Sequence, residues 1–165
     1  MTPAFQDQIP GNHCFGCGPD NPGGLHIKSF WTGPGTSECT FQPGPQHNAG
    51  PPDLLNGGII ATLVDCHCVC TAIAGAYLRE GRAIGEGELI WYVTGTITVR
   101  YLKPAPLAQP VNLVATILEE GPRKTRVACV VHSGDVICAE GEVIAIRVAI
   151  PQRPAIDGTL REKTG

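Results

Sequence analysis

A single carboxylate lies inside a long apolar segment of this chain. Asp65 is the one formal charge between residues 54 and 78, and the pair Gly57-Gly58 stands near the start of the same segment. On a helix, Asp65 would share a face with Gly58 and other small residues, which solvate a carboxylate poorly and therefore raise its pKa. Backbone N–H groups at a helix N-terminus favour developing negative charge, and glycine lets a ligand approach them. The segment thus offers a base and an oxyanion donor, or alternatively a capped helix whose carboxylate bonds to a neighbouring strand.

The same segment is long enough to cross a membrane, but its residues disfavour that role. A charge such as Asp65 near mid-span costs about 2.5–3.5 kcal/mol on insertion scales. Asn56, His67 and the glycine pair add to the cost. We therefore expect a helix over about 56–77, capped by Asn56 and buried on most sides inside a soluble fold.

The remainder of the chain reads as strands around this helix. Two strands are expected before it, at 25–32 and 37–43, and four after it, at 89–102, 111–119, 123–132 and 135–148. One long helix and six strands predict an α+β fold in which an antiparallel sheet wraps the helix. With 165 residues, we expect one domain, with an irregular N-terminal segment at 1–23 and a peripheral tail at 151–165.

Charge and composition exclude some classes of partner. The net charge is −3, and no long basic run is present, so neither nucleic acid nor an anionic membrane surface is an expected partner. The first residues lack the basic start and apolar run of a secretory signal. We therefore expect a cytoplasmic protein whose eight cysteines are reduced.

Cys14 and Cys17 have the Cys-x-x-Cys spacing of half a zinc site. The other half would have to come from the helix, where Cys66 and Cys70 share a face and His67 points about 100° away. Because that ligand geometry is poor, we expect no metal and small buried thiols, with a zinc site and a redox pair as the alternatives. His67 follows Asp65 directly, and adjacent helical residues do not face each other, so we expect a packed histidine rather than a catalytic dyad.

Three blocks of sequence resemble acyl-CoA thioesterases of the hotdog fold, of the phenylacetate-pathway type. In chain order they are HCFGCGPDNPGGLHI, LNGGIIATLVD and TGTITVRYLKPAP, and together they cover much of residues 13–148. The resemblance implies that Asp65 is the general base or the nucleophile, and that the N–H of Gly57 or Gly58 polarises the thioester carbonyl. It also implies that Thr94 positions the carboxylate or water. Period-2 counting puts Thr94 on the polar face of its strand, so a bulge or a partner subunit has to bring it to Asp65.

The chain departs from this family at two positions. Asn56 stands where the family commonly has His, and Gly50 stands where many members place an Asn that helps to hold the thioester. His47 and Asn48 lie close in the sequence and are candidates to replace it. For the phosphates of coenzyme A, the favoured cations are Lys103, Arg123 and Lys124.

These observations predict a homodimer or a dimer of dimers that hydrolyses an acyl-CoA thioester at a site between subunits. No cofactor is expected beyond the coenzyme A of the substrate. One alternative is a hydratase or dehydratase of the same fold that acts on an enoyl thioester through Asp53 and His47. The other is a non-catalytic acyl-CoA-binding module. Release of free coenzyme A distinguishes hydrolysis from both.

Overall fold

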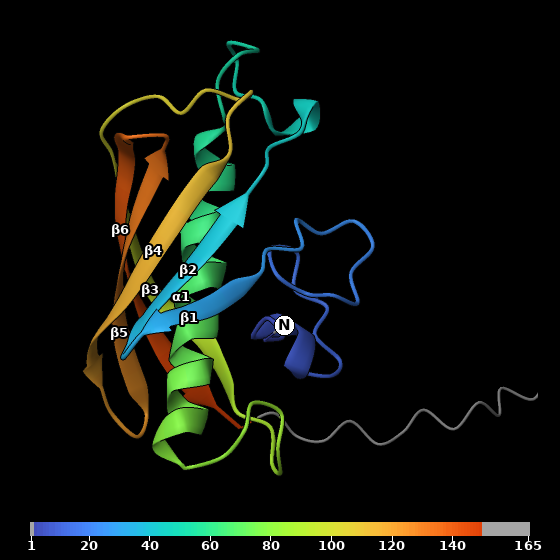
Figure 1. Ribbon diagram of the computed structural model, residues 1–165, viewed down its shortest axis with the longest axis vertical. Helices are drawn as coiled ribbons and strands as arrows, with labels where there is room; N and C mark the ends of the chain where they lie inside the picture. Colours follow the sequence, from blue (N-terminus) through green and yellow to red (C-terminus); the bar gives the residue numbers. More distant parts are fainter. Residues whose placement is uncertain (1, 150–165) are drawn as a thin grey trace, which may run out of the picture.

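The computed structural model describes residues 2–149. One long helix, α1 (Gly57–Arg79), lies between a six-stranded antiparallel sheet and the N-terminal segment (Figure 1). The strand order is β1-β2-β4-β5-β6-β3, with short 3-10 helices η1 (Gln6–Gln8) and η2 (Pro45–His47) outside the sheet. The strands are β1 (Ser29–Gly33), β2 (Thr36–Phe41), β3 (Trp91–Tyr101), β4 (Val111–Glu120), β5 (Lys124–Ser133) and β6 (Val136–Val148). This confirms the predicted hotdog architecture; the tail expected at 151–165 lies outside the described residues.

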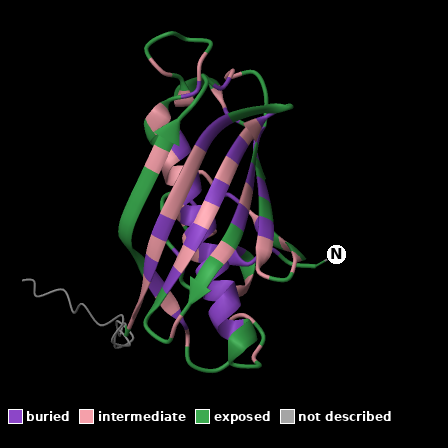
Figure 2. Cartoon of the chain, turned by 90° about the vertical axis from the view of Figure 1, so that its left-hand side faces the viewer, coloured by how far each residue is buried: buried purple, intermediate pink, exposed green. Residues whose placement is uncertain are grey.

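Helix α1 is the core of the molecule. By length and composition it could cross a membrane, yet 72% of its most apolar 18-residue window is buried within the fold. Leu63, Val64, Cys68 and Ala72 are fully shielded from solvent, and the helix runs behind the sheet in Figure 2. Its apolar character on most sides is therefore explained by cover from the sheet on one side and the N-terminal segment on the other.

The sheet makes room for the helix with a glycine. A Cβ atom on Gly141 of β6 would lie 2.5 Å from Cγ1 of Val64. The neighbouring strand β5 alternates as its sequence predicts, with Val127, Cys129 and Val131 buried and the residues between them partly exposed. The close approach of helix and sheet thus depends on the sheet as well as on the small residues of the helix.

The first strand is shorter than the sequence predicts, because β1 begins only at Ser29. The N–H of Leu25 donates to Phe15 O at 2.8 Å, and the N–H of Ile27 donates to Gly16 O at 3.2 Å. His26 between them has a φ of 54°, in the left-handed region. The segment 25–28 is therefore bound to the loop that carries Cys14 and Cys17, and not to a neighbouring strand.

Strand β3 is an edge strand that pairs only with β6, and it contains a bulge. Thr94 is opposite Ala145 and Thr96 is opposite Ile144, so Gly95 has no partner. Because paired residues in antiparallel strands lie on the same side of the sheet, Thr94 shares the helix-facing side with the buried Ala145. The extra residue turns Thr94 away from the face that simple alternation assigns to it.

Candidate active site

Asp65 and Thr94 meet across the helix–sheet interface. The hydroxyl of Thr94 donates a hydrogen bond to Oδ1 of the half-buried Asp65. Burial raises the pKa of the Asp65 carboxyl above its ordinary value, and the hydrogen bond from Thr94 opposes part of that rise. The structure therefore brings together two residues named from the sequence, and it does so by the bulge at Gly95 within one chain.

The N-terminus of α1 is capped by Asn56. Its Oδ1 accepts hydrogen bonds from the N–H of Gly58 at 2.7 Å and from the N–H of Ile59 at 3.4 Å. The Gly58 N–H is therefore occupied, whereas the Gly57 N–H has no acceptor within residues 2–149. Of the two donors that the sequence suggested, the structure leaves Gly57 available to a ligand.

Tyr101, which the sequence analysis did not single out, lies over this helix end. Its hydroxyl donates to Gly57 O at 2.6 Å, and its ring would lie 3.4 Å from a Cβ atom built on Gly57. The side chain is 52% exposed, so it covers the helix end from the solvent side. The sequence signal that could have identified it is its place at the end of the strand that also carries Thr94.

His47 and Asn48, which were expected to hold the thioester, lie near the helix N-terminus, but their side chains bond to other residues of the loop. The carbonyl of His47 accepts the N–H of Asn56 at 2.9 Å, while its Nδ1 accepts the N–H of Gly44 at 2.9 Å. The His47 ring also packs against Phe41, with 5.3 Å between ring centroids. The side-chain amide of Asn48 donates to Ala49 O at 3.0 Å. This loop fixes the helix entry, and its side chains bond chiefly within the loop.

The expected cations lie at opposite ends of the helix. Lys103 follows β3 at the Gly57 end, where its N–H donates to Cys138 O at 3.1 Å. Arg123 and Lys124 lie at the turn between β4 and β5, which is the end where Arg79 of α1 pairs with Glu120 at 3.4 Å. A single chain therefore does not bring these three cations to one phosphate group.

His67 points away from Asp65, toward β1 and β2. Its Nδ1 lies 2.8 Å from Ser29 Oγ, and its Nε2 lies 3.3 Å from Ser37 O. Burial lowers the pKa of His67 to about 4. It is therefore a neutral, hydrogen-bonded core residue, as its place next to Asp65 on the helix predicted.

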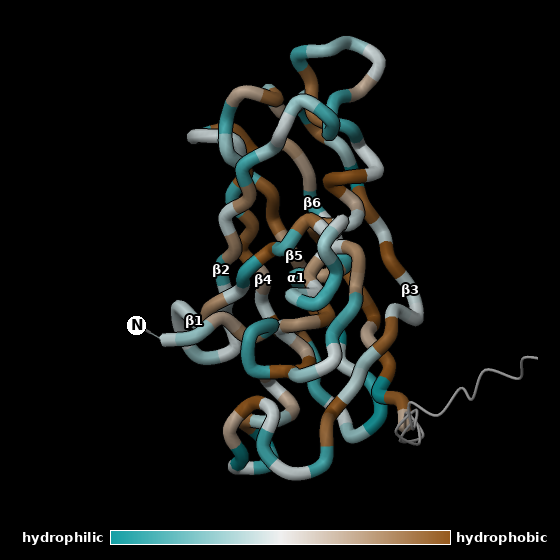
Figure 3. The backbone as a smooth tube through the Cα atoms, turned by 90° about the vertical axis from the view of Figure 1, so that its right-hand side faces the viewer, coloured by the Kyte–Doolittle hydropathy of each residue, from teal (hydrophilic) through white to brown (hydrophobic). Residues whose placement is uncertain are grey.

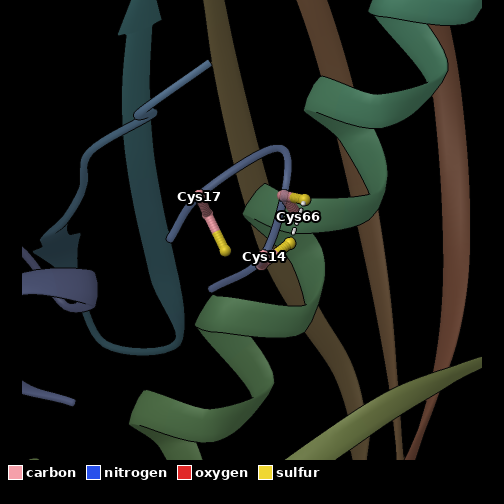
Figure 4. Close-up of side chains that lie close together, drawn as sticks. All are labelled: Cys14, Cys17 and Cys66. Atoms are coloured by element: carbon pink, nitrogen blue, oxygen red, sulfur yellow. Dashed lines mark hydrogen bonds between the residues drawn. The ribbon is translucent and has the colours of Figure 1, made fainter. Parts of the chain in front are cut away.

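Two cysteines of the N-terminal loop lie beside a cysteine of the helix. The Sγ atoms of Cys14, Cys17 and Cys66 all lie within 4.8 Å of one another (Figure 4). The sequence indicated that a zinc site would need Cys14 and Cys17 of the loop together with ligands from the helix, and the structure brings Cys66 of the helix to these two loop sulfurs. Of the alternatives that the sequence left open, the zinc site therefore has three candidate ligands in one place.

Comparison with known proteins places this chain in a family. No protein-family model matches it. It is 30% identical to the acyl-coenzyme A thioesterase THEM4 of Xenopus laevis over 112 residues, which are 68% of this chain and 44% of that protein. The chain thus spans less than half the length of this curated relative.

Solved structures give a fuller match. A thioesterase superfamily protein from Shewanella loihica PV-4 is 31% identical, with a TM-score of 0.60 over 74% of this chain and 91% of that one. The protein smu.793 of Streptococcus mutans UA159, solved bound to acetyl CoA, is 16% identical, with a TM-score of 0.58 over 74% of this chain and 88% of that one. On the match to the Shewanella protein, together with its helix and sheet, the chain belongs to the thioesterase superfamily of the hotdog fold.

Proposed function

We propose that the protein hydrolyses an acyl-CoA thioester, with Asp65 as general base or nucleophile. The observation that carries this proposal is the contact between Asp65 and Thr94, which a bulge in β3 makes possible. A strand needs no bulge for stability, since the extra residue interrupts the ladder. A catalytic role for Asp65 would explain why β3 keeps a bulge that places the Thr94 hydroxyl against this carboxylate.

The groups described above are sufficient for hydrolysis of a thioester. In the general-base form, Asp65 takes a proton from water as the water oxygen attacks the thioester carbonyl carbon. The C–S bond then breaks, and coenzyme A leaves as a thiolate that takes up a proton. Because a thiolate is a good leaving group, no strong general acid is required. Partial burial supports the basicity of Asp65, since it raises the pKa of this carboxyl.

The carbonyl needs a hydrogen-bond donor as negative charge develops on its oxygen. We assign this role to the Gly57 N–H, because the Gly58 N–H is bonded to Asn56. The positive end of the α1 dipole adds to the effect. The bond from Tyr101 to Gly57 O ties the first turn of α1 to the end of β3.

One chain cannot apply both groups to the same carbonyl. Gly57 and Asp65 are eight residues apart, which is about 12 Å along a helix. Two chains paired along β3 in antiparallel fashion solve this problem, because Thr94 lies beside Asp65 and Tyr101 lies beside Gly57. The Asp65 end of one chain then faces the Gly57 end of its partner. We therefore propose a homodimer with composite sites.

The proposed substrate class follows from two relatives. The matching Xenopus protein is named an acyl-coenzyme A thioesterase, and the Streptococcus structure holds acetyl CoA. Because Lys103 and the pair Arg123-Lys124 lie at opposite ends of one chain, an antiparallel dimer would put the pair from one chain at the same end as Lys103 of the other. The three cations named from the sequence would then converge on the phosphates.

The test measures thiol release from short, medium, long and aromatic acyl-CoAs, with thermal melting on the same samples. Asp65→Asn should lower the turnover of the best substrate by roughly 10²–10⁴. Its melting temperature should not fall, since an amide is easier to bury than a charge. Asp53→Asn is the matched control, because this exposed residue lies outside the proposed site, and it should keep its activity.

Three outcomes would overturn the proposal. Full activity of Asp65→Asn would remove the carboxylate from the mechanism. Loss of enoyl-CoA absorbance without thiol release, and with sensitivity to Asp53→Asn, would indicate the hydratase alternative. Binding of acyl-CoA with no turnover of any substrate would indicate a non-catalytic binding module.

A further inference from the structure

Four cysteines from two distant segments meet beside the proposed active site. Cys14 and Cys17 come from the N-terminal loop, and Cys66 and Cys70 come from α1; we refer to these four as the thiol cluster. The Sγ atoms of Cys14 and Cys66 are 3.6 Å apart, and those of Cys17 and Cys70 are also 3.6 Å apart. In Figure 4 the sulfurs of the three labelled residues turn toward one another across the gap between loop and helix.

The loop is shaped to bring its sulfurs to the helix. A Cβ atom on Gly16 would lie 2.3 Å from Cys66 Sγ, so only glycine lets the backbone approach this closely. The N–H of Gly18 donates to Cys14 O at 2.8 Å, which closes the turn around the Cys-x-x-Cys segment. A Cβ atom on Gly18 would lie 2.4 Å from the nitrogen of Cys14. Two glycines thus fix the approach of the loop and the curvature of its turn.

A polar side chain supports the cluster from outside. The N–H of Cys14 donates to Asn12 Oδ1 at 3.1 Å, and Asn12 Nδ2 lies 3.7 Å from Cys17 Sγ. Asn12 is buried, so its amide is committed to this loop. An amide donor aimed at a sulfur is the kind of outer contact that stabilises a thiolate ligand.

The spacing of the sulfurs fits a metal ion. With zinc–sulfur bonds of about 2.3 Å, two sulfurs of a tetrahedral site lie about 3.8 Å apart. The two measured separations are close to this value and far beyond the roughly 2.05 Å of a disulfide. Packing of apolar thiols alone requires neither the convergence of three sulfurs nor a directed amide.

We propose that the thiol cluster binds one zinc ion, with Cys14, Cys17 and Cys66 as thiolate ligands. Cys70, whose Sγ is 3.6 Å from that of Cys17 but which is not among the three sulfurs within 4.8 Å of one another, is the candidate that would have to move in to fill the fourth position. Each thiol loses its proton to solvent as the metal binds, so no oxidant or reductant takes part. With Cys70 in the fourth position, all four ligands would come from the protein, as in a structural rather than a catalytic zinc site. The ion would fasten the N-terminal segment to the helix next to Asp65.

The first test measures metal content. Protein purified under reducing conditions is stripped with a chelator, reloaded with Zn²⁺ without oxygen, desalted and analysed for zinc. Wild type should retain about one zinc ion per chain. Cys14→Ser and Cys17→Ser should each retain roughly a tenth of that or less. Cys14 is exposed, so Cys14→Ser is the variant least affected by problems of folding, and circular dichroism checks both.

Cys68→Ala is the matched control, because this buried cysteine lies on the same helix but contacts Cys129 of β5 instead. It should retain as much zinc as wild type. Zinc retained by the Cys14→Ser, Cys17→Ser double variant, or no zinc retained by wild type, would overturn the proposal. So would wild type and double variant with the same melting temperature in excess Zn²⁺ and in chelator, since a ligand of the folded state must stabilise it.

A second test examines the fourth ligand with cobalt as the probe. Co²⁺ bound by thiolates gives a charge-transfer absorption that increases with the number of sulfurs. Cys70→Ser should therefore keep the ion but lose about a quarter of that absorption. Unchanged absorption would remove Cys70 from the proposed set. Neither test depends on turnover, so failure of the zinc proposal and failure of the proposed thioesterase activity can be told apart.

Discussion

Asn56 and Gly57 have different tasks at the same helix end. The side chain of Asn56 satisfies the Gly58 N–H, which stabilises the helix in the usual manner of an N-cap. The Gly57 N–H remains as a donor that a substrate can use. At position 56, where the resembled family commonly has His, this chain has Asn, which is a strong capping residue. The Gly57 N–H is therefore the donor that remains for a ligand at this helix end.

Gly57→Pro tests that donor with little disturbance of the fold. Gly57 is the first helical residue, where proline is well tolerated, and Asn56 before it already has extended backbone angles. Removal of the N–H should lower kcat/KM by roughly 10²–10³, the effect of one oxyanion donor in other enzymes. Gly57→Ala keeps the N–H and should remain close to wild type. Equal losses in both variants would instead indicate a steric effect against the Tyr101 ring.

At the scale of elements, the bulge in β3 decides which residues face the helix. Without the bulge, the alternation that places Ile97 and Val99 on the inner face would also place Gly95 and Val93 there, and Thr94 on the outer face. The extra residue moves Thr94 to that face instead. A Cβ atom on Gly95 would lie 2.6 Å from Ile146 Cγ1 and 3.2 Å from Ile144 O, so the bulge leaves no room for a side chain.

Gly95→Ala should therefore shift the bulge and weaken the bond between Thr94 and Asp65. We expect turnover to fall about as far as in Thr94→Ala, by roughly tenfold, the value of one hydrogen bond to a charged group. The melting temperature should also fall, because the new methyl group has to displace the partly buried Ile146 of the neighbouring strand. Gly33→Ala is the control, since its Cβ would meet no atom within 4 Å. Normal turnover in a stable Gly95→Ala protein would show that the bulge is not needed.

Most elements could be predicted from the sequence, and the exceptions have physical reasons. The helix follows from its long apolar segment, and the last four strands follow from their period-2 alternation between turn residues. The start of β1 could not be predicted, because Leu25 and Ile27 bond to a loop about ten residues earlier in the chain. The sequence named Cys66 as a possible partner of Cys14 but could not predict their convergence, because it depends on how an irregular segment folds back.

For the whole molecule, the exposed edge of β3 is the main unpartnered surface in the described part of the chain. Ile97 is 39% exposed and Tyr101 is 52% exposed on the side that faces the helix, and Val93 is 48% exposed on the other side. Figure 3 shows β3 at the border of the sheet, with apolar stretches along it. An eleven-residue edge strand with such residues is a template for pairing with another chain. In the proposed dimer, a second copy of β3 would pair with its backbone groups and cover its apolar side chains.

The composite site makes a prediction that only a dimer can meet. Asp65→Asn lacks the base and Gly57→Pro lacks the donor, so each homodimer should be inactive. A mixed dimer has one site with the donor from the first chain and the base from the second, both intact. Chains mixed in equal amounts by unfolding and refolding should form mixed dimers in about half of cases, with one active site of two.

Thiol release in the mixture should therefore recover to about a quarter of the wild-type rate. Light scattering before and after mixing checks that the species is a dimer. Two Asp65→Asn preparations refolded together are the control and should stay inactive. If base and donor acted within one chain, no mixture could restore turnover, because every chain carries one defect. Recovery thus requires that Asp65 of one chain and Gly57 of its partner act on the same thioester.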